Sequence, residues 1–312
     1  MQYRKLGTAG TKVSAISLGG WINFEAKLPK KEAQSIIALA IERGINFFDM
    51  ADVYGYGKSE KWMGKMLRDY PRHTLVISTK VFGQMSSDVN DRGLSRKHIM
   101  ESIDKSLRRL GTDYVDIYFC HRPDPDTPIL ETTRAMTDLI HMGKVVYWGT
   151  SMWEPEQLAE AHNLAERYQL VPPQVEQPQY SMLYRERVET KIIPAAQKYG
   201  LGLTAFSPLA MGMLTGKYDD GIPEESRFAK ETWAKDEVFN EAARQKVLRL
   251  KPIAEDLGMT RGQLALAWLL RHPEVSTVLT AATLASQVAE NVSAADVTLS
   301  TEALAAVEAA LA

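Results

Sequence analysis

The chain has 312 residues, of which 45% are hydrophobic and 24% charged, and its formal net charge is −2. This is the composition of a soluble globular protein, and without a long basic or acidic block it gives no electrostatic sign of binding to nucleic acid or to an anionic membrane. The length suits two ordinary domains or one large α/β barrel, and the expected partner is a small molecule or a protein.

Other features concern the cell compartment. The longest apolar runs fall short of the roughly 18 residues that a membrane-spanning helix needs. The N-terminal residues 1–5 are polar and contain no apolar targeting segment. A single cysteine, Cys120, excludes an internal disulfide. The sequence therefore predicts a cytoplasmic protein that does not insert into a membrane.

The predicted elements begin with a β-hairpin, because the turn signal 7–10 separates the short runs 3–6 and 12–14. Strands and helices then alternate. The expected strands are 16–20, 46–50, 75–80, 115–120, 144–149, 174–176, 203–206 and 277–279. The expected helices after them are 29–43, 59–68, 95–110, 128–142, 155–168, 187–199, 260–270 and 285–292, with a last helix at 301–312.

Eight strand–helix pairs imply a parallel sheet with right-handed crossovers, and eight units are enough to close a barrel. A doubly wound sheet is the competing architecture, but no break in composition divides the chain. The prediction is an α/β fold, a (β/α)8 TIM barrel with an N-terminal β-hairpin, as a single domain over residues 1–312.

One insertion interrupts the alternation between strand 7 and helix 7. Residues 207–259 form a loop rich in Gly and Pro, followed by one extra helix at about 237–257. Loops after the C-terminal ends of barrel strands carry function, so this insertion is a candidate ligand clamp.

Four ionisable residues lie at the C-terminal ends of successive predicted strands. Asp49 and Tyr54 belong to strand 2, Lys80 to strand 3 and His121 to strand 4. Each alone has a structural explanation: a helix cap, a packing aromatic, a solvated lysine or a core histidine. Together, at one mouth of a barrel, they favour a catalytic site.

This combination suits the reduction of a carbonyl group. Hydride addition leaves an alkoxide that must be protonated, and a tyrosine with a pKa of about 10 is a poor acid unless a nearby cation favours its phenolate. Lys80 can be that cation, Asp49 can be the partner that a buried ammonium needs, and His121 can polarise the carbonyl oxygen. A metal hydrolase is disfavoured, because of six histidines only His121 lies at a predicted strand end.

Nucleotide-binding motifs are incomplete. The segment 55–60 has two of the three Rossmann glycines but Glu60 in the third place, and 212–218 is one residue short of a P-loop, with Tyr218 where Ser or Thr is needed. What remains is an anion site formed by Lys217, Arg227 and the start of the helix after 281–283, or else a solvated loop with ordinary charges.

Longer motifs contain these residues. They include Gly44-x4-Asp49-x-Ala51-x2-Tyr54-x5-Glu60, Ser78-Thr79-Lys80, Asp116-Ile117-Tyr118-Phe119-Cys120-His121 and Gly149-Thr150-Ser151. With these motifs the chain strongly resembles the aldo-keto reductases, from Tyr3 to about Asn291. The segments 122–125, 147–153, 207–218 and 287–291 are most similar to the branch of potassium-channel β-subunits and its microbial enzyme relatives.

The resemblance implies a (β/α)8 barrel that binds NADPH in an extended form without a Rossmann domain. It implies that Tyr54 is the general acid, that Lys80 and Asp49 tune it, and that His121 orients the substrate. It places Trp21 near the nicotinamide, Ser151 and Gln177 on the carboxamide, and Phe206 against the ring. The rest of the implied cofactor site is Ser207, Pro208, Leu209, Ala210 and Gly212 around the pyrophosphate, Lys217, Arg227 and Gln287 at the 2′-phosphate, Ala281 and Thr283 before the last barrel helix, and Glu290 and Asn291 at the adenine.

The chain departs from the branch at two places. Ala281-Ala282-Thr283 stands where the branch commonly has Gly-Ala-Ser, and His121 stands where channel β-subunits commonly have Asn. The histidine favours working catalysis. The expectation is an NADP-dependent aldehyde reductase or alcohol dehydrogenase that acts on small aldehydes or ketones. The alternative is a nucleotide-bound regulatory partner of a membrane channel with little turnover. In either case the resemblance implies a homo-oligomer, a tetramer or an octamer.

Overall fold

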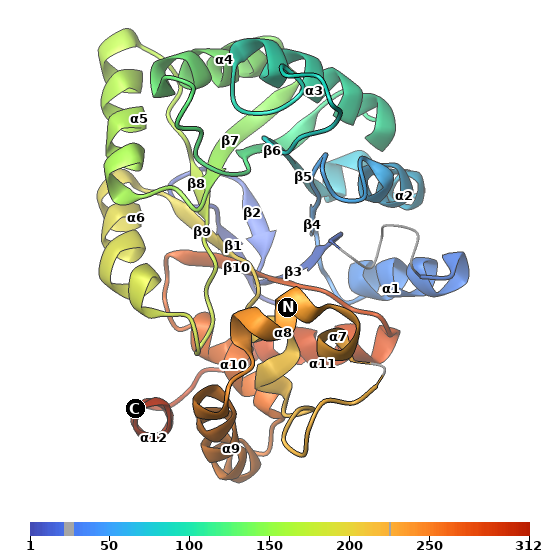
Figure 1. Ribbon diagram of the computed structural model, residues 1–312, viewed down its shortest axis with the longest axis vertical. Coiled ribbons are helices and arrows are strands. Elements are labelled where there is room, and N and C mark those ends of the chain that lie inside the picture. The colour runs from blue at the N-terminus through green and yellow to red at the C-terminus, as the bar shows by residue number, and fades with distance from the viewer. Residues whose placement is uncertain (22–27, 225) are drawn as a thin grey trace.

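A computed structural model describes residues 1–21, 28–224 and 226–312, and Figure 1 shows its ribbon. Eight parallel strands form a closed barrel in the order β10-β3-β4-β5-β6-β7-β8-β9. They are β3 Ile16–Gly19, β4 Phe47–Asp49, β5 Val76–Val81, β6 Val115–Cys120, β7 Val145–Ser151, β8 Val175–Gln177, β9 Gly202–Ala205 and β10 Val275–Thr280. The predicted TIM barrel is confirmed, and the doubly wound alternative is excluded.

Helices surround the barrel and bury their apolar stripes against it (Figure 1). They are α1 Lys30–Glu42, α2 Lys58–Leu67, α3 Arg96–Leu110, α4 Ile129–His141, α5 Pro155–Tyr168, α6 Ile193–Tyr199, α10 Arg261–Leu269, α11 Ala285–Ser293 and α12 Thr301–Leu311. Short 3-10 turns η1 (Arg72–Thr74) and η4 (Ala294–Asp296) lie between them. In the described part of the chain, none of the helices has the length and apolar character that crossing a membrane requires.

The hairpin closes one end of the barrel. Its strands, β1 Tyr3–Lys5 and β2 Lys12–Ser14, pair antiparallel as predicted. Leu6 is fully buried in a cluster with residues of the barrel interior, and Arg4 donates a hydrogen bond to the carbonyl of Val275 at the start of β10 (2.9 Å). The hairpin therefore covers the N-terminal ends of the strands, and the C-terminal ends form the open mouth.

The insertion between β9 and α10 is more structured than expected. It contains η3 Ala210–Thr215, α7 Arg227–Lys230, α8 Thr232–Val238 and α9 Glu241–Asp256. The prediction of a single extra helix starting near residue 237 is thus wrong in two respects. The Asn240 side chain accepts a hydrogen bond from the Ala243 amide (2.8 Å) and so caps α9 after α8 has ended, and α7 and α8 are too short to give a periodic apolar pattern.

The sixth barrel helix also begins differently. A wide π-helical turn, η2 Val188–Ile192, precedes α6, whereas the sequence predicts one regular helix over 187–199. Pro194 lies at the start of α6 and has no amide hydrogen to donate to the preceding turn. The wider turn accommodates this missing donor, as π-type bulges in helices do.

Candidate active site

A buried ion pair lies at the mouth, on the neighbouring strands β4 and β5. The Lys80 ammonium is fully buried and donates to Asp49 Oδ2 (2.5 Å) and to the Met50 carbonyl (2.8 Å). The other carboxylate oxygen, Asp49 Oδ1, accepts from Ser78 Oγ (2.6 Å) and Gln177 Nε2 (3.3 Å). Burial lowers the pKa of Lys80, and Asp49 opposes that shift. Asp49 therefore favours the charged form of Lys80 against the effect of burial.

The tyrosine reaches this ion pair from the turn between β4 and α2. The Lys80 ammonium lies 3.4 Å from the Tyr54 hydroxyl and 5.0 Å from the centre of its ring. The turn is tied to β5, because the Asp52 amide donates to the Lys80 carbonyl (3.2 Å). A cation at this distance favours the phenolate over the phenol, which makes the hydroxyl a better proton donor.

His121 follows β6 and completes the group. Its ring meets the Tyr54 ring edge-on, with centroids 5.6 Å apart and planes at 77°. Burial, with further contributions from Lys80 and Arg122, lowers the pKa of His121 well below its usual value. The imidazole is therefore neutral near pH 7, and its N–H can donate a hydrogen bond to a carbonyl oxygen placed beside the Tyr54 hydroxyl.

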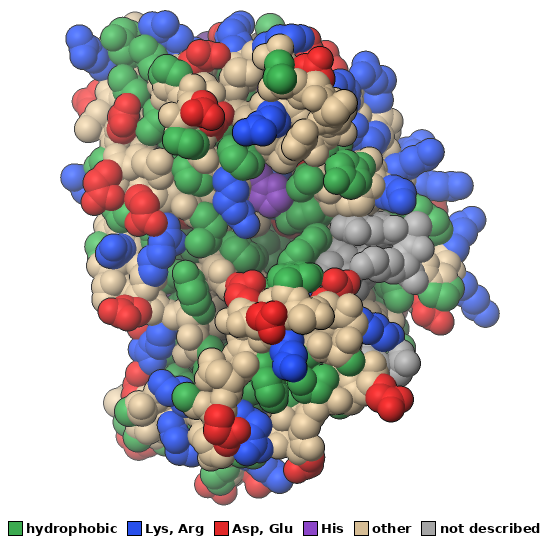
Figure 2. Space-filling view, viewed as in Figure 1, with side chains coloured by type: hydrophobic (Ala, Val, Ile, Leu, Met, Phe, Trp, Pro, Cys, Tyr) green, Lys and Arg blue, Asp and Glu red, His purple; other side chains and the backbone are tan. Residues whose placement is uncertain are grey.

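Two indole rings form an apolar wall above the tyrosine. Trp21 lies 6.2 Å from the Tyr54 ring, and Trp233 of α8 lies 5.5 Å from Trp21. Gln179 Nε2 also donates to Glu237 Oε1 of α8 (3.0 Å). These contacts hold α8 across the mouth, where Figure 1 shows it. In the same view, Figure 2 shows a hollow with a histidine among hydrophobic and basic side chains.

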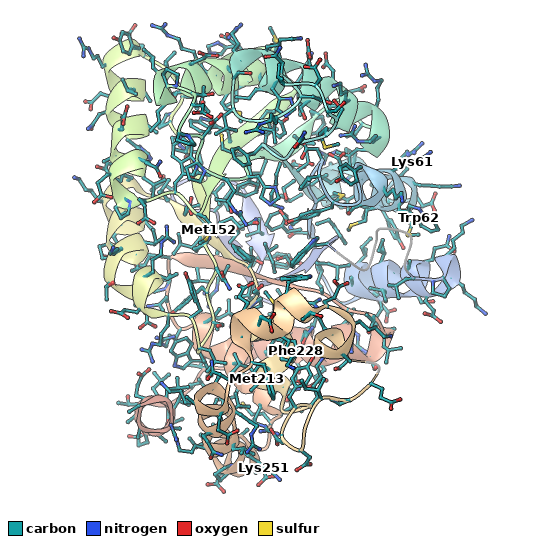
Figure 3. All side chains as sticks on the ribbon, viewed as in Figure 1. Lys61, Trp62, Met152, Met213, Phe228 and Lys251 are labelled. Carbon is teal, nitrogen blue, oxygen red and sulfur yellow. The ribbon has the colours of Figure 1, made fainter. Side chains whose placement is uncertain are left out.

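The next strand ends carry the residues expected at the carboxamide. Ser151 Oγ donates to the Gln177 carbonyl (2.9 Å), which joins the ends of β7 and β8. Gln177 Nε2 is already in contact with Asp49, so this part of the mouth is connected to the ion pair. Phe206 follows β9 and pairs through a β-bridge with Gln179. Met152, labelled in Figure 3, follows Ser151 with a left-handed backbone (φ 60°).

The loop after β9 has an unusual backbone. Ser207, Ala210, Met211 and Gly212 have φ angles of 53°, 48°, 55° and 96°. Pro208 and Leu209 lie between the first two of these. A Cβ atom at Gly212 would lie 2.7 Å from Lys217 Nζ, so a side chain there would displace the lysine. The Ala210 and Gly212 amides donate within the loop, to the Ser207 and Leu209 carbonyls (2.9 Å each), so the left-handed backbone forms a compact turn beside Lys217.

Two cations follow in the same insertion. Burial lowers the pKa of Lys217, and the charge of Arg227 lowers it further. Burial also lowers the pKa of Arg227, while Tyr218 and Glu231 oppose that shift. Within the described residues, no carboxylate forms an ion pair with either side chain. Phe228, labelled in Figure 3, stacks on Tyr218 (4.2 Å between centroids) and so anchors α7 beside Lys217. Lys217 is exposed and Arg227 is partly buried, and two neighbouring cations that form no ion pair in the described part of the chain fit the phosphate of a cofactor.

The end of β10 lies beside the end of β9, because these strands pair. The Gln287 side-chain oxygen accepts hydrogen bonds from the amides of Thr283 (2.8 Å) and Leu284 (3.3 Å), so its amide nitrogen is the group available to a ligand. Glu290 accepts from Thr260 Oγ1 (2.7 Å) and is held at the start of α10. Ala281 is exposed and Asn291 is buried.

A second pair of acidic residues is buried behind Tyr54. Glu60 accepts from Thr79 Oγ1 (2.6 Å) and Arg109 Nε (2.5 Å), and Asp52 accepts from Ser102 Oγ (2.9 Å). Burial, followed by the charge of Glu60, raises the pKa of Asp52 to about 7. Because this carboxyl holds its proton more tightly in the folded state, its contribution to stability is complete below about pH 4 and is lost as the pH rises through 7.

We therefore expect Asp52→Asn to become more stable relative to wild type as the pH rises from 4 to 8. The relative change in the free energy of unfolding is about 2–4 kcal/mol, since one pKa unit corresponds to about 1.4 kcal/mol. Urea denaturation at pH 4, 6 and 8 measures it. Asp69→Asn changes an exposed carboxyl and serves as the control. Parallel pH curves for wild type and Asp52→Asn would show that Asp52 ionises normally.

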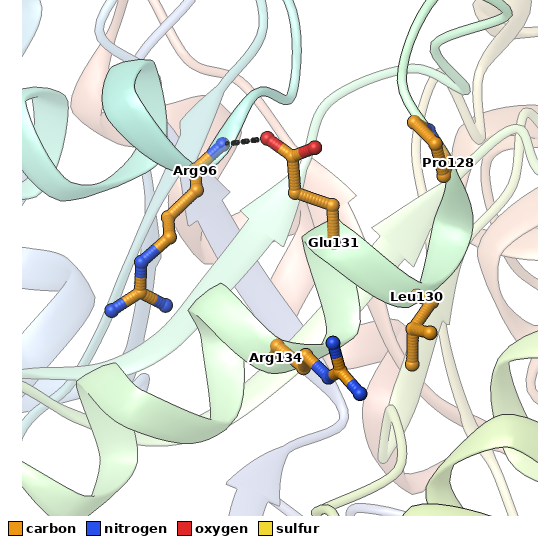
Figure 4. A pocket seen from close by; sticks show the side chains of 5 residues that line it. All are labelled: Arg96, Pro128, Leu130, Glu131 and Arg134. Atoms are coloured by element: carbon orange, nitrogen blue, oxygen red, sulfur yellow. Dashed lines mark hydrogen bonds between the residues drawn. The ribbon is translucent and has the colours of Figure 1, made fainter.

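Two surface hollows lie away from these residues. Figure 4 shows one of about 470 Å³, between the start of α3 and α4, lined by Arg96, Pro128, Leu130, Glu131 and Arg134. The other, of about 430 Å³, is lined by Lys61, Arg68, Lys105, Arg108 and Arg109. Neither contains a residue of the mouth. The described residues also contain no group of three His, Cys, Asp or Glu placed to hold a metal ion.

Sequence reasoning missed two side chains at the mouth. Trp233 belongs to a helix that the sequence did not predict. Arg122 lies in a quoted motif but was not singled out; its Nη1 donates to the His121 carbonyl (2.6 Å) and to Ser151 Oγ (3.3 Å). The one feature of the sequence that pointed to Arg122 is its position directly after His121, at the end of a predicted strand.

Comparison with known proteins gives a consistent result. The model of the aldo/keto reductase family matches residues 15–312. A protein from Arabidopsis thaliana described as a probable voltage-gated potassium channel subunit beta is 50% identical over 303 residues, which cover 95% of this chain and 92% of the relative. A protein from Oryza sativa subsp. japonica with the same description is 48% identical over 305 residues, with the same coverage.

Proposed function

Because the chain belongs to the aldo/keto reductase family and is thus an oxidoreductase, we propose that it reduces aldehydes or ketones to alcohols with NADPH, and that Tyr54 donates the proton. The observation that carries this proposal is the contact between the Tyr54 hydroxyl and the Lys80 ammonium (3.4 Å), with Asp49 behind it. The experiment that tests it is NADPH oxidation with a panel of aldehydes, compared between wild type and Tyr54→Phe.

Each residue of the mouth then has a distinct task. The bound cofactor supplies the hydride for the carbonyl carbon. The neutral His121 and the Tyr54 hydroxyl hydrogen-bond to the carbonyl oxygen, and Tyr54 transfers its proton to this oxygen as negative charge develops there. Lys80 stabilises the phenolate that remains, and Asp49 keeps Lys80 charged. Trp21 and Trp233 restrict access of water from above.

The cofactor site is also a proposal. Ser151 and Gln177 hold the carboxamide, Phe206 stacks on the nicotinamide, and the left-handed loop after β9 contacts the pyrophosphate. Lys217 and Arg227, together with the Gln287 amide, hold the 2′-phosphate. Glu290 and Asn291 lie toward the adenine. The support is the pair of cations Lys217 and Arg227, which form no ion pair within the described residues, beside a loop with a left-handed backbone.

This arrangement predicts a preference for NADPH over NADH. Lys217→Met removes a cation from the 2′-phosphate, so we expect the dissociation constant for NADPH to rise about 10- to 100-fold while that for NADH changes little. Fluorescence titration of the free protein measures both constants without turnover. Lys251→Met, an exposed lysine of α9 labelled in Figure 3, is the matched control. An equal loss of affinity for NADPH and NADH, or no loss of affinity for either, would contradict the assignment of Lys217 to the 2′-phosphate.

The second candidate function is a nucleotide-bound regulatory partner of a membrane channel, in a complex of four or eight copies. The observation in its favour is the description of the two plant relatives as channel β-subunits. Co-purification with a membrane protein, together with negligible turnover of every aldehyde, would favour it over catalysis. The mass of the protein in solution tests the assembly separately.

A further inference from the structure

The side chain of Arg122 lies at the mouth, between the ends of three barrel strands. It follows His121 at the end of β6, donates to Ser151 at the end of β7, and has its guanidinium carbon 5.9 Å from the centre of the Phe206 ring after β9. The bond from Nη1 to the His121 carbonyl (2.6 Å) fixes the base of the side chain. The guanidinium is thus held in one position beside the proposed reaction site.

The charge of Arg122 is not fully balanced by a protein group. Lys80 has Asp49 as its counter-ion, but within the described chain no carboxylate lies in ion-pair distance of Arg122. Burial lowers the pKa of Arg122, and two nearby groups, Tyr54 and Glu176, oppose that shift. Burial raises the pKa of Glu176 to about 7, and its carboxylate accepts a hydrogen bond from Thr150 Oγ1 (2.5 Å). Glu176 therefore balances the charge of Arg122 only in part near pH 7.

Part of the guanidinium is available to a ligand. Both protein hydrogen bonds of Arg122 use Nη1, and the described structure shows none from Nε or Nη2. These two nitrogens form one edge of the planar guanidinium, which matches two oxygens of a carboxylate or phosphate. A purely structural arginine has no need of this free edge.

We propose that Arg122 binds an anionic group of the substrate, so that the preferred substrates are aldehydes or ketones that also carry a carboxylate or a phosphate. The proposal rests on the proposed function. The apolar wall of Trp21 and Trp233 contacts the remainder of the substrate, and Arg122 selects its charged end. This anion site is separate from that of the cofactor phosphate, which lies in the insertion after β9.

Pairs of matched substrates test the inference. Butanal is compared with succinic semialdehyde, and glycolaldehyde with its phosphate, so the two pairs distinguish carboxylate from phosphate. We expect wild type to prefer the anionic member of at least one pair at least tenfold in kcat/KM. Arg122→Gln should reduce that preference about tenfold, mainly through KM, because it removes the charge and the paired donors. Arg122→Lys should keep part of it, since it retains the charge alone.

The control is Arg134→Gln, an exposed arginine of α4 drawn in Figure 4. It should leave the preference as in wild type. An equal loss for both members of a pair in Arg122→Gln would assign Arg122 to the developing oxyanion or to folding, and would overturn the proposal. An absence of preference for charge in wild type would overturn it too.

A binding measurement separates this inference from the proposed function. Benzoate and benzamide have similar shape and do not react, and quenching of tryptophan fluorescence reports their dissociation constants. We expect benzoate to bind wild type at least tenfold more tightly than Arg122→Gln, and benzamide to bind both alike. That result with no turnover of any aldehyde would reject the reductase and keep the anion site. Equal binding of benzoate to both proteins would reject the anion site.

Discussion

The Tyr54→Phe variant is expected to reduce aldehydes about 10²- to 10⁴-fold more slowly in kcat than wild type, which corresponds to roughly 3–5 kcal/mol in activation free energy. The change removes one oxygen, the proton donor that lies 3.4 Å from the Lys80 ammonium. The ring remains, with its contacts to Trp21 and His121. Cofactor affinity should therefore stay within a few fold of wild type.

Absorbance loss of NADPH under saturating aldehyde measures kcat, and fluorescence titration measures cofactor binding. Tyr56→Phe is the matched control, because Tyr56 lies two residues away and is 73% exposed. Tyr56→Phe should have the same kcat and the same cofactor affinity as wild type. Equal kcat values for wild type and Tyr54→Phe would mean that another group donates the proton, and the account of the site would then be wrong.

The second large effect concerns the buried ion pair. Lys80→Met leaves the Asp49 carboxylate buried without its cation, and we expect a loss of about 3–5 kcal/mol in the free energy of unfolding together with loss of activity. The double variant Asp49→Asn with Lys80→Met also removes the unpaired carboxylate. The Asn side chain can still accept hydrogen bonds from Ser78 and Gln177. The double variant should recover much of the stability and none of the activity.

Chemical denaturation of the four proteins of this cycle measures the coupling. Lys97→Met is the control, because Lys97 is exposed and forms its ion pair with Glu101 on its own helix, where solvent screens the interaction. If the double variant were less stable than Lys80→Met, the cost would come from lost packing. The unpaired Asp49 carboxylate would then not be the cause of the lost stability.

The same ion pair predicts a pH effect. Asp49 raises the pKa of Lys80 against the effect of burial, so Asp49→Asn lets Lys80 lose its proton at lower pH. The decline of kcat on the alkaline side should then begin at lower pH in the residual activity of the variant. A pH profile of kcat measures this shift, and an unchanged alkaline decline would remove Asp49 from the role of tuning Lys80.

Much of the barrel and of its mouth could be predicted, because both depend on local patterns. Apolar runs of strand length alternate with helical stripes, and Asp49, Lys80 and His121 come at the points where such runs end. Parallel strands bring their C-terminal ends together, so residues far apart in the sequence meet at one mouth. The structure brings these three and Tyr54 together.

The parts that could not be predicted depend on contacts between distant segments. The contact of Trp233 with Trp21 requires α8 to cross the mouth, and nothing in the spacing of a seven-residue helix specifies that position. The bond from Thr260 to Glu290 depends on the packing of α10 beside α11. The free edge of Arg122 is visible only once the partners of every nearby carboxylate are known.

Transfer of a deuterium label from the cofactor tests the central claim most directly. Wild type is given NADPH deuterated at the transferable position of C4 and an aldehyde that the panel shows to be consumed, and the alcohol is analysed by mass spectrometry. The account predicts one deuterium on the carbinol carbon and one alcohol for each NADPH oxidised, with labelled alcohol formed about 10²- to 10⁴-fold more slowly in Tyr54→Phe. Alcohol formed without the label, or no alcohol from any aldehyde, would contradict it.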